Sequence, residues 1–115
     1  MATTDRQDRG REGEDDALAL LQGHGLALVE RNFRCTGGEL DLIMRDGTHL
    51  VFVEVRRRHS RAFGGAAASI TPAKQRRMRI AAQTFLLRYR QPPPCRFDIV
   101  AIDGDAVSWL KNALD

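Results

Sequence analysis

The sequence has few of the features that mark secreted, membrane-embedded or thiolate-metal proteins. Its two cysteines, Cys35 and Cys95, lie far apart and outside any CxxC motif, so neither a redox pair nor a zinc site is expected. No apolar run approaches the ~20 residues of a transmembrane helix, and the polar start MATTDRQDRGREGEDD has no signal-peptide core. We therefore expect a cytoplasmic protein with free thiols and no membrane partner.

Negative charge is missing from a long central part of the chain. The sequence has 18 Lys and Arg residues and 15 Asp and Glu residues, yet the span 55–97 holds eleven of these cations and no acid. A surface of one sign attracts polyanions because binding releases their condensed counterions. The distribution therefore favours a nucleic-acid-binding surface over a face that only keeps the protein soluble. The eleven cations are Arg56, Arg57, Arg58, Arg61, Lys74, Arg76, Arg77, Arg79, Arg88, Arg90 and Arg96.

The length of 115 residues suits one domain with a single modest core. We expect a flexible polar N-terminus over residues 1–10 and one folded domain over residues 11–115. A first helix is predicted from about Arg11 to Gly23, where the GHG sequence stops it. Glu14 lies on the same helical stripe as the apolar residues that follow it, so it should point toward the packed face.

The rest of the chain predicts a mixed sheet flanked by helices. Alternating apolar residues indicate three antiparallel strands in succession, and a loop rich in small residues then leads to a second helix that begins at Pro72 with Thr71 as its cap. A fourth strand follows the PPP sequence, and the last segment, AVSWLKNAL, reads as a short strand or helix. The predicted order is α-β-β-β-α-β, an α/β fold. The strands are expected at 26–34, 39–45, 48–58 and 95–103.

Three acids, Glu39, Asp41 and Glu54, stand in the second and third predicted strands, where a core would favour valine. If Asp46-Gly47 forms a two-residue hairpin turn, Glu39 lies opposite Glu54 and Asp41 is a diagonal neighbour of Glu54. Because side chains alternate along a strand, these acids and Arg56 then project from the same face. Like charges opposite one another call for a compensating cation, which a bound metal or Arg56 could supply.

This cluster of carboxylates predicts a metal site. Asp41 and Glu54 can converge on one ion, and oxygen ligands suit Mg²⁺ or Mn²⁺ better than zinc. Glu14, arriving from the first helix, could add a ligand directly or through water. Such an ion could polarise a phosphodiester and activate a bound water. The alternative is an ordinary solvent-facing sheet surface on which acids pair with arginines.

The motifs resemble those of a known group of proteins. GGELDLI followed by VFVEVRRR resembles the D...(D/E)xK signature of restriction-endonuclease-like nucleases. The whole chain, including FGGAAASITPAKQRRM and CRFDIVAI, resembles the small YraN-like (UPF0102) family of bacterial proteins, which is similar to archaeal Holliday-junction resolvases. The resemblance implies a restriction-endonuclease-like core with Asp41 and Glu54 as metal-binding catalytic acids. It also implies that Glu14 and Glu39 are further acids of the site, and that Arg56 stands where the signature has lysine.

Three functions fit these observations. The first is a Mg²⁺- or Mn²⁺-dependent nuclease acting on DNA, with structured or junction-like DNA as the expected substrate. In such a nuclease, Lys74 is a second candidate, besides Arg56, for the role of the motif lysine. The second is a binding module of the same fold that does not cleave, and the third is a subunit that binds an acidic protein. By analogy with junction enzymes, the protein is expected to allow a homodimer. The residues expected to bind nucleic acid are Arg57, Arg58, Arg61, Lys74, Arg76, Arg77 and Arg79.

Overall fold

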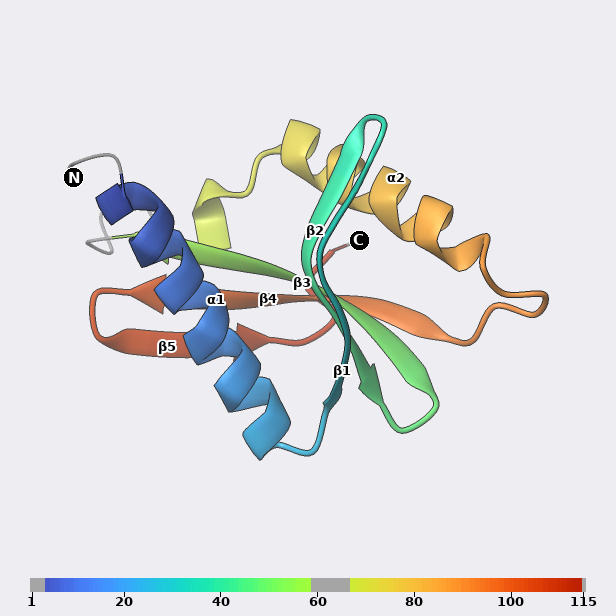
Figure 1. Ribbon diagram of the computed structural model, residues 1–115, viewed down its shortest axis with the longest axis horizontal. Helices are drawn as coiled ribbons and strands as arrows, with labels where there is room; N and C mark the ends of the chain where they lie inside the picture. The colour runs from blue at the N-terminus through green and yellow to red at the C-terminus, as the bar shows by residue number, and fades with distance from the viewer. Residues whose placement is uncertain (1–3, 59–66, 115) are drawn as a thin grey trace.

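The computed structural model describes residues 4–58 and 67–114 of the chain. Two α-helices, a short 3₁₀ helix and five strands follow one another in the order α-β-β-β-α-β-β, which confirms the predicted α/β class and adds a closing strand (Figure 1). The elements are α1 (Thr4–Gly23), β1 (Ala27–Cys35), β2 (Gly38–Asp46), β3 (His49–Arg58), η2 (Ala67–Ser69), α2 (Pro72–Leu86), β4 (Cys95–Asp103) and β5 (Ala106–Leu110).

The strands form one five-stranded mixed sheet in the order β1-β2-β3-β4-β5. The first three strands are antiparallel, β3 and β4 are parallel, and β5 returns antiparallel to β4. Parallel neighbours need a crossover connection, and η2 and α2 lie in the segment that provides it. Among the described residues, neither helix has the length and apolar composition needed to cross a membrane.

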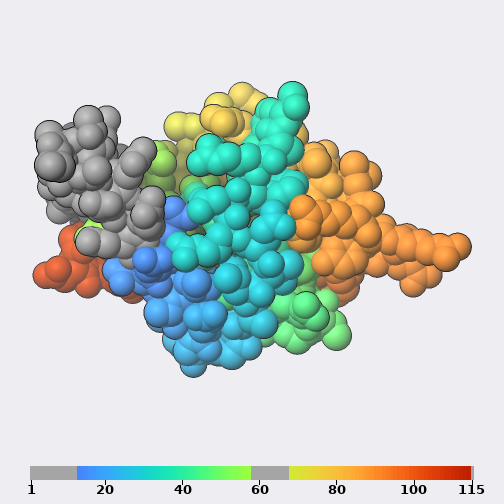
Figure 2. All heavy atoms as spheres, viewed as in Figure 1, coloured from blue at the N-terminus to red at the C-terminus, as the bar shows by residue number. Residues whose placement is uncertain are grey.

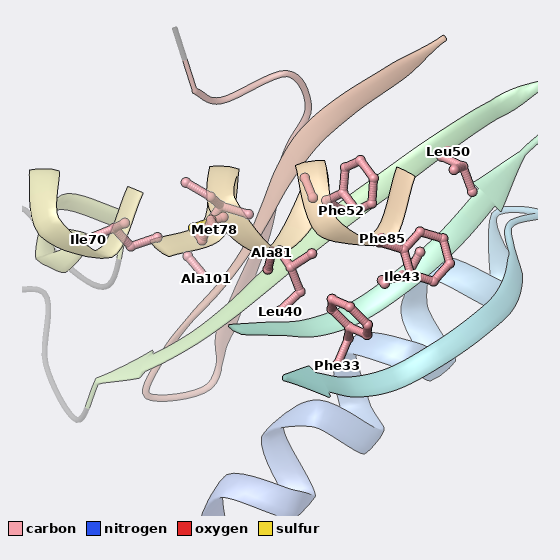
Figure 3. Close-up of a cluster of buried hydrophobic side chains, with 12 residues drawn as sticks. Phe33, Leu40, Ile43, Leu50, Phe52, Ile70, Met78, Ala81, Phe85 and Ala101 are labelled. Carbon is pink, nitrogen blue, oxygen red and sulfur yellow. The ribbon is translucent and has the colours of Figure 1, made fainter. Parts of the chain in front are cut away.

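The two helices cover opposite faces of the sheet, giving three layers (Figure 1). On the α1 side, Ala17 and Leu21 pack against Val51 and Val53 of β3 and against buried side chains of β2 and β4. On the α2 side, the buried stripe of the helix meets a second cluster (Figure 3). That cluster contains Phe33, Leu40, Ile43, Leu50, Phe52, Ile70, Met78, Ala81, Ala82, Phe85, Ile99 and Ala101. The alternation predicted for the third strand is thereby confirmed, because its valines face α1 whereas Leu50 and Phe52 face α2.

Helix α2 begins where its sequence predicts. Thr71 has an extended backbone and its side chain accepts a hydrogen bond from the backbone N–H of Lys74 at 3.1 Å, while Pro72 occupies the first turn. The helix ends at Leu86, so Tyr89, predicted on its apolar stripe, lies beyond it. The chain between α2 and β4 projects from the body of the molecule (Figure 2).

Helix α1 starts earlier than predicted. It begins at Thr4 and not near Arg11, because an apolar stripe marks only the part of a helix that packs and says nothing of polar turns before it. Its end at Gly23 is as predicted, with Gly25 at a φ of 92° just beyond. The predicted loop at 59–71 lies largely outside the described residues, and η2 occupies part of its described remainder.

The start of β2 packs directly on the backbone of α2. A Cβ atom placed on Gly38 would lie 2.7 Å from the backbone nitrogen of Ala81 and 2.7 Å from the carbonyl oxygen of Arg77. Such separations are too short for any side chain, so only glycine allows this approach. The hairpin between β1 and β2 accordingly lies across α2 (Figure 1).

Gly38→Ala is therefore expected to destabilise the protein. The strand and helix would have to separate, which we expect to lower the free energy of unfolding by about 1–3 kcal/mol, the usual cost of overpacking. Gly23→Ala is the matched control, because its added Cβ would meet nothing within 4 Å and should be neutral or slightly stabilising. Urea unfolding of both variants measures the difference, and equal stability would contradict the close packing.

Candidate metal and phosphate site

The hairpin between β2 and β3 turns one residue later than predicted. The loop is Gly47-Thr48, with Asp46 paired to His49, and Gly47 carries the positive φ of 61°. A turn with glycine at its first loop position needs no positive φ at the aspartate, which explains the choice. The predicted pairing of Glu39 with Glu54 is wrong. The shift is two residues in register, so Asp41 and Glu54 still project from the same face.

The corrected register brings Asp41 level with Glu54. The paired ladder between β2 and β3 ends at Leu42 and Val53, and the next residues in this register are Asp41 and Glu54. In place of a further ladder bond, the backbone N–H of Val55 donates to Asp41 Oδ2 at 2.8 Å. The two acids are thus cross-strand neighbours and not the diagonal pair that the sequence predicted.

These acids line a cavity of about 300 Å³ that draws on four elements. Glu14 comes from α1, Asp41 from β2, Glu54 from β3 and Lys74 from α2. Its full lining is Gly13, Glu14, Asp41, Glu54, Val55, Arg56, Arg57 and Lys74. The structure therefore brings together the acid of the first helix and the two acids of the hairpin, as the sequence predicted.

Lys74 is the cation that compensates these acids. Its Nζ lies 2.7 Å from Glu39 Oε1 and 3.2 Å from Glu54 Oε2, and only 17% of its side chain is exposed. Arg56, the side chain that the sequence suggested for this role, donates from Nε to Ser69 Oγ at 2.7 Å while still lining the cavity. Lys74 belongs to the cavity, although the sequence also suggested it for an exposed nucleic-acid surface.

Two carboxylate oxygens in this cavity are buried without a hydrogen-bond partner among the described residues. They are Glu14 Oε1 and Glu54 Oε2, and the Lys74 ion pair to the latter does not have hydrogen-bonding geometry. Glu54 is only 3% exposed. Buried carboxylate oxygens without donors are costly in an empty site and are natural positions for a cation.

Burial dominates the electrostatics of the cavity. It raises the pKa of Glu54 to about 9, with the hydrogen bond and charge of Asp41 adding to the effect. Burial and the charge of Asp41 also raise the pKa of Glu14. In contrast, the hydrogen bond from Lys74 lowers the pKa of Glu39. Burial alone would lower the pKa of Lys74, but its hydrogen bond to Glu39 and the charge of Glu54 outweigh this and raise it, so the side chain is an ammonium at neutral pH.

The oxygen ligands of the cavity suit an ion such as Mg²⁺ or Mn²⁺, which keeps several water or phosphate ligands. They are too few for a metal whose ligands all come from the protein. The described residues contain no group of three or more His, Cys, Asp and Glu side chains close enough to hold an ion by themselves. Mg²⁺ usually takes only one or two carboxylates and fills its remaining positions with water and substrate phosphate. Asp41 and Glu54, with the unpartnered oxygen of Glu14 nearby, meet that requirement.

The predicted basic surface divides into several parts. Arg57 lines the cavity, whereas Arg76 and Arg77 are exposed on α2. Arg79 is half-buried and lines a separate hollow between α2 and β4. The side chain of Arg58 and all of Arg61 lie outside the described residues. Two of the predicted arginines are therefore available on the exposed part of α2.

The sequence is similar to those of a family of bacterial proteins. The family model for the uncharacterised protein family UPF0102 matches residues 13–102. The chain belongs to UPF0102. It is 61% identical to a UPF0102 protein of Herminiimonas arsenicoxydans over 112 residues, covering 97% of this chain and 90% of the relative. It is also 61% identical to a UPF0102 protein of Janthinobacterium sp. (strain Marseille), with 97% and 91% covered.

A third UPF0102 protein, from Cupriavidus taiwanensis, is 60% identical over 96% of this chain and 85% of its own length. The predicted resemblance to this family is thereby confirmed. The span matched by the UPF0102 model, residues 13–102, includes every residue that lines the cavity. The family name assigns no activity, so the chemistry has to be argued from the site.

One buried polar group of this UPF0102 member was missed by the sequence analysis. Asp98 on β4 is fully buried and accepts hydrogen bonds from Arg96 Nε at 3.1 Å, Trp109 Nε1 at 2.9 Å and the backbone N–H of Asn112 at 2.9 Å. Arg96 also reaches Asp46 Oδ2 at 3.0 Å. An acid inside the apolar run FDIVAI was the available signal, of the same kind that singled out Glu54.

The raised pKa of Glu54 predicts a pH-dependent cost to the metal-free fold. Unfolded Glu54 releases its proton near pH 4.5, whereas folded Glu54 keeps it to about pH 9, so stability is lost as pH rises between these values. Glu54→Gln should remove this cost and raise the free energy of unfolding at pH 8 in EDTA by about 1 kcal/mol or more. At pH 4 the gain should vanish.

Thermal melts at both pH values, with the surface variant Glu30→Gln as control, measure this difference. Glu30 pairs with Arg88 at 3.1 Å on an exposed surface, so its replacement should change stability little at either pH. A Glu54→Gln variant less stable than the parent at pH 8 would mean that ionised Glu54 is well solvated or well paired.

Proposed function

We propose that this protein is a metal-dependent nuclease that hydrolyses phosphodiester bonds, with DNA, and structured or junction-like DNA in particular, as its substrate. The observation that supports this most strongly is the meeting of Asp41, Glu54 and Lys74 in one cavity from three different elements. Two carboxylates for a hard metal ion and one ammonium for a phosphate are groups that can catalyse phosphodiester hydrolysis. The order of elements agrees with the restriction-endonuclease-like core implied by the sequence resemblance.

In this proposal each side chain of the cavity has a separate task. Asp41 and Glu54 would hold Mg²⁺ or Mn²⁺, and Glu14 would hold it directly or position a water. When bound, the ion would polarise the phosphodiester and lower the pKa of a bound water. Lys74, charged at neutral pH, would donate to a phosphate oxygen and stabilise the negative charge that develops there, and it would not act as a base.

Arginines at the cavity and on α2 would bind the rest of the substrate. Arg56 and Arg57 line the cavity, where a guanidinium can bind a phosphate with two hydrogen bonds. Arg77 on α2 is exposed over 54% of its side chain. Contacts of this kind fix the position of a backbone without reading its bases, which agrees with recognition of shape.

A binding module that does not cleave is the competing proposal. It is favoured by arginine in the lysine position of the motif and by a described site with fewer than three acids close enough to form a metal cluster. Such a module would bind nucleic acid through the same arginines, and Mg²⁺ would change nothing.

A cleavage assay on a panel of substrates separates the two proposals. Labelled duplex, single-stranded, flap and four-way-junction DNA are incubated with the protein in Mg²⁺, Mn²⁺ or EDTA. The nuclease proposal predicts metal-dependent cleavage, strongest on a structured substrate. Binding that weakens steeply with salt and is followed by no cleavage on any substrate would support the module instead.

A further inference from the structure

Glu39 differs from the other acids of the site in having both oxygens engaged by cations. Its Oε1 accepts a hydrogen bond from Lys74 Nζ at 2.7 Å and lies 3.5 Å from Arg77 Nη2. Its Oε2 lies 3.6 Å from Arg34 Nη1. Glu39 is also absent from the lining of the cavity. The sequence placed it among the metal ligands, but its surroundings are those of a carboxylate that binds side-chain cations.

The backbone on both sides of the Glu39 to Lys74 bond is held in place. Glu39 follows Gly38, whose lack of a Cβ allows β2 to touch the backbone of α2. Lys74 lies in the first turn of α2, where its own N–H is fixed by Thr71 Oγ1 at 3.1 Å. The distance between the two residues is therefore set by packing of the strand against the helix. The ion pair therefore differs from one between two mobile side chains on the surface.

Lys74 needs such a partner because its side chain is long and flexible. An ammonium on a four-carbon stem has many conformations, and fixing it costs entropy. Its contact with Glu54 at 3.2 Å lacks hydrogen-bonding geometry, so that contact alone orients it poorly. The 2.7 Å bond to Glu39 supplies the direction. Glu39 thus determines where the ammonium stands relative to the cavity.

We propose that Glu39 is a positioning residue, which holds the Lys74 ammonium beside Glu54 and the cavity and does not ligate the metal. Its consequence for cleavage rests on the proposed nuclease function. The Glu39 to Lys74 bond itself is independent of that function and can be tested without metal or substrate.

The chain is well suited to that test because it has only two lysines, Lys74 and Lys111. Lys111 is exposed and lies over the Trp109 ring, away from the cavity, so it serves as an internal standard. The rate of acetylation of each lysine under limiting reagent is followed by mass spectrometry in EDTA. Glu39→Ala should speed modification of Lys74 several-fold relative to Lys111. Glu39→Gln, whose amide oxygen still accepts a hydrogen bond, should speed it less.

Glu30→Ala is the matched control, because it removes an acid of the same chain that pairs with an arginine at 3.1 Å. It should leave the ratio of the two lysine rates unchanged. If Glu39→Ala also leaves that ratio unchanged while melting at a similar temperature, Glu39 does not hold Lys74 and the inference is wrong. Cleavage activity does not enter this outcome.

Calorimetric titration with Mn²⁺ then separates positioning from ligation. Glu39→Ala should keep the Mn²⁺ affinity of the parent, whereas Asp41→Ala should lose it. If the protein cleaves DNA, Glu39→Ala should lower kcat about 10- to 100-fold with little change in KM, as for residues that orient a catalytic group. A loss of Mn²⁺ affinity as large as that of Asp41→Ala would make Glu39 a ligand. Failure of the parent to cleave would defeat the proposed function and leave the lysine result standing.

Discussion

Lys74→Ala is expected to lower the rate of metal-dependent cleavage at least about a hundredfold, the usual cost of removing one charge-stabilising group from a transition state. Lys74 is the only lysine within the family-matched span, and its ammonium lies 3.2 Å from Glu54. Because the group is argued to act on charge that develops during the reaction, the loss should appear in kcat more than in KM. Single-turnover cleavage of the preferred substrate measures it.

Comparing Arg56→Ala with Lys74→Ala shows which of the two side chains takes the role of the lysine in the D...(D/E)xK signature. Arg56 occupies the motif position in the sequence, but its Nε is bonded to Ser69 at 2.7 Å. We expect its replacement to weaken substrate binding more than catalysis, with a smaller loss in kcat than Lys74→Ala. The opposite ranking would show that arginine performs the task of the motif lysine and that Lys74 has a structural role.

Asp98→Ala is expected to have the largest effect on stability. The change leaves three donors without their acceptor, and Arg96 loses one of its two carboxylate partners in a network that ties β4 to β5 and to the β2–β3 turn. Removing one member of a buried ion pair typically costs about 3–5 kcal/mol. That is a large share of the roughly 5–15 kcal/mol by which a small domain is stable. Urea unfolding should show the loss, or the variant should fail to accumulate as folded protein.

Asp105→Ala is the control for this prediction. Asp105 is exposed in the turn before β5, and surface substitutions of this kind usually change stability by no more than about 0.5 kcal/mol. Asp98→Asn should fall between the two, because it keeps the size and an acceptor oxygen but loses the charge. Equal stability of Asp98→Ala and Asp105→Ala would mean that the buried network contributes little.

The local elements could be predicted from the sequence because their causes are local. Alternating apolar residues, the Thr71-Pro72 helix start and the glycine after α1 each depend on a few neighbouring residues. The hairpin register was misplaced by two residues because it depends on which residue accepts a positive φ, and both Asp46-Gly47 and Gly47-Thr48 offer a glycine. Side-chain alternation has period two, so the error left the faces of Asp41 and Glu54 correct.

The partners within the site could not be predicted, because they come from distant parts of the chain. Lys74 is 35 residues from Glu39, and their contact depends on how closely α2 approaches β2 at Gly38. No spacing in the sequence gives that distance. For the same reason the sequence suggested a metal or Arg56 as the cation that compensates the acids, and did not suggest Lys74 for this role. The structure brings Lys74 to them in the folded chain.

Nuclease function is tested most directly by cleavage of a labelled four-way junction by the parent protein and by the double variant Asp41→Asn, Glu54→Gln, each in Mg²⁺ and in EDTA. Both substitutions keep the size of the side chain, and a melting curve confirms that the variant is folded. A metal-dependent nuclease that uses these two acids should cleave as the parent protein in Mg²⁺ only, and the variant should not cleave in either condition. Cleavage that persists in EDTA or in the folded double variant would contradict the metal-dependent role of Asp41 and Glu54.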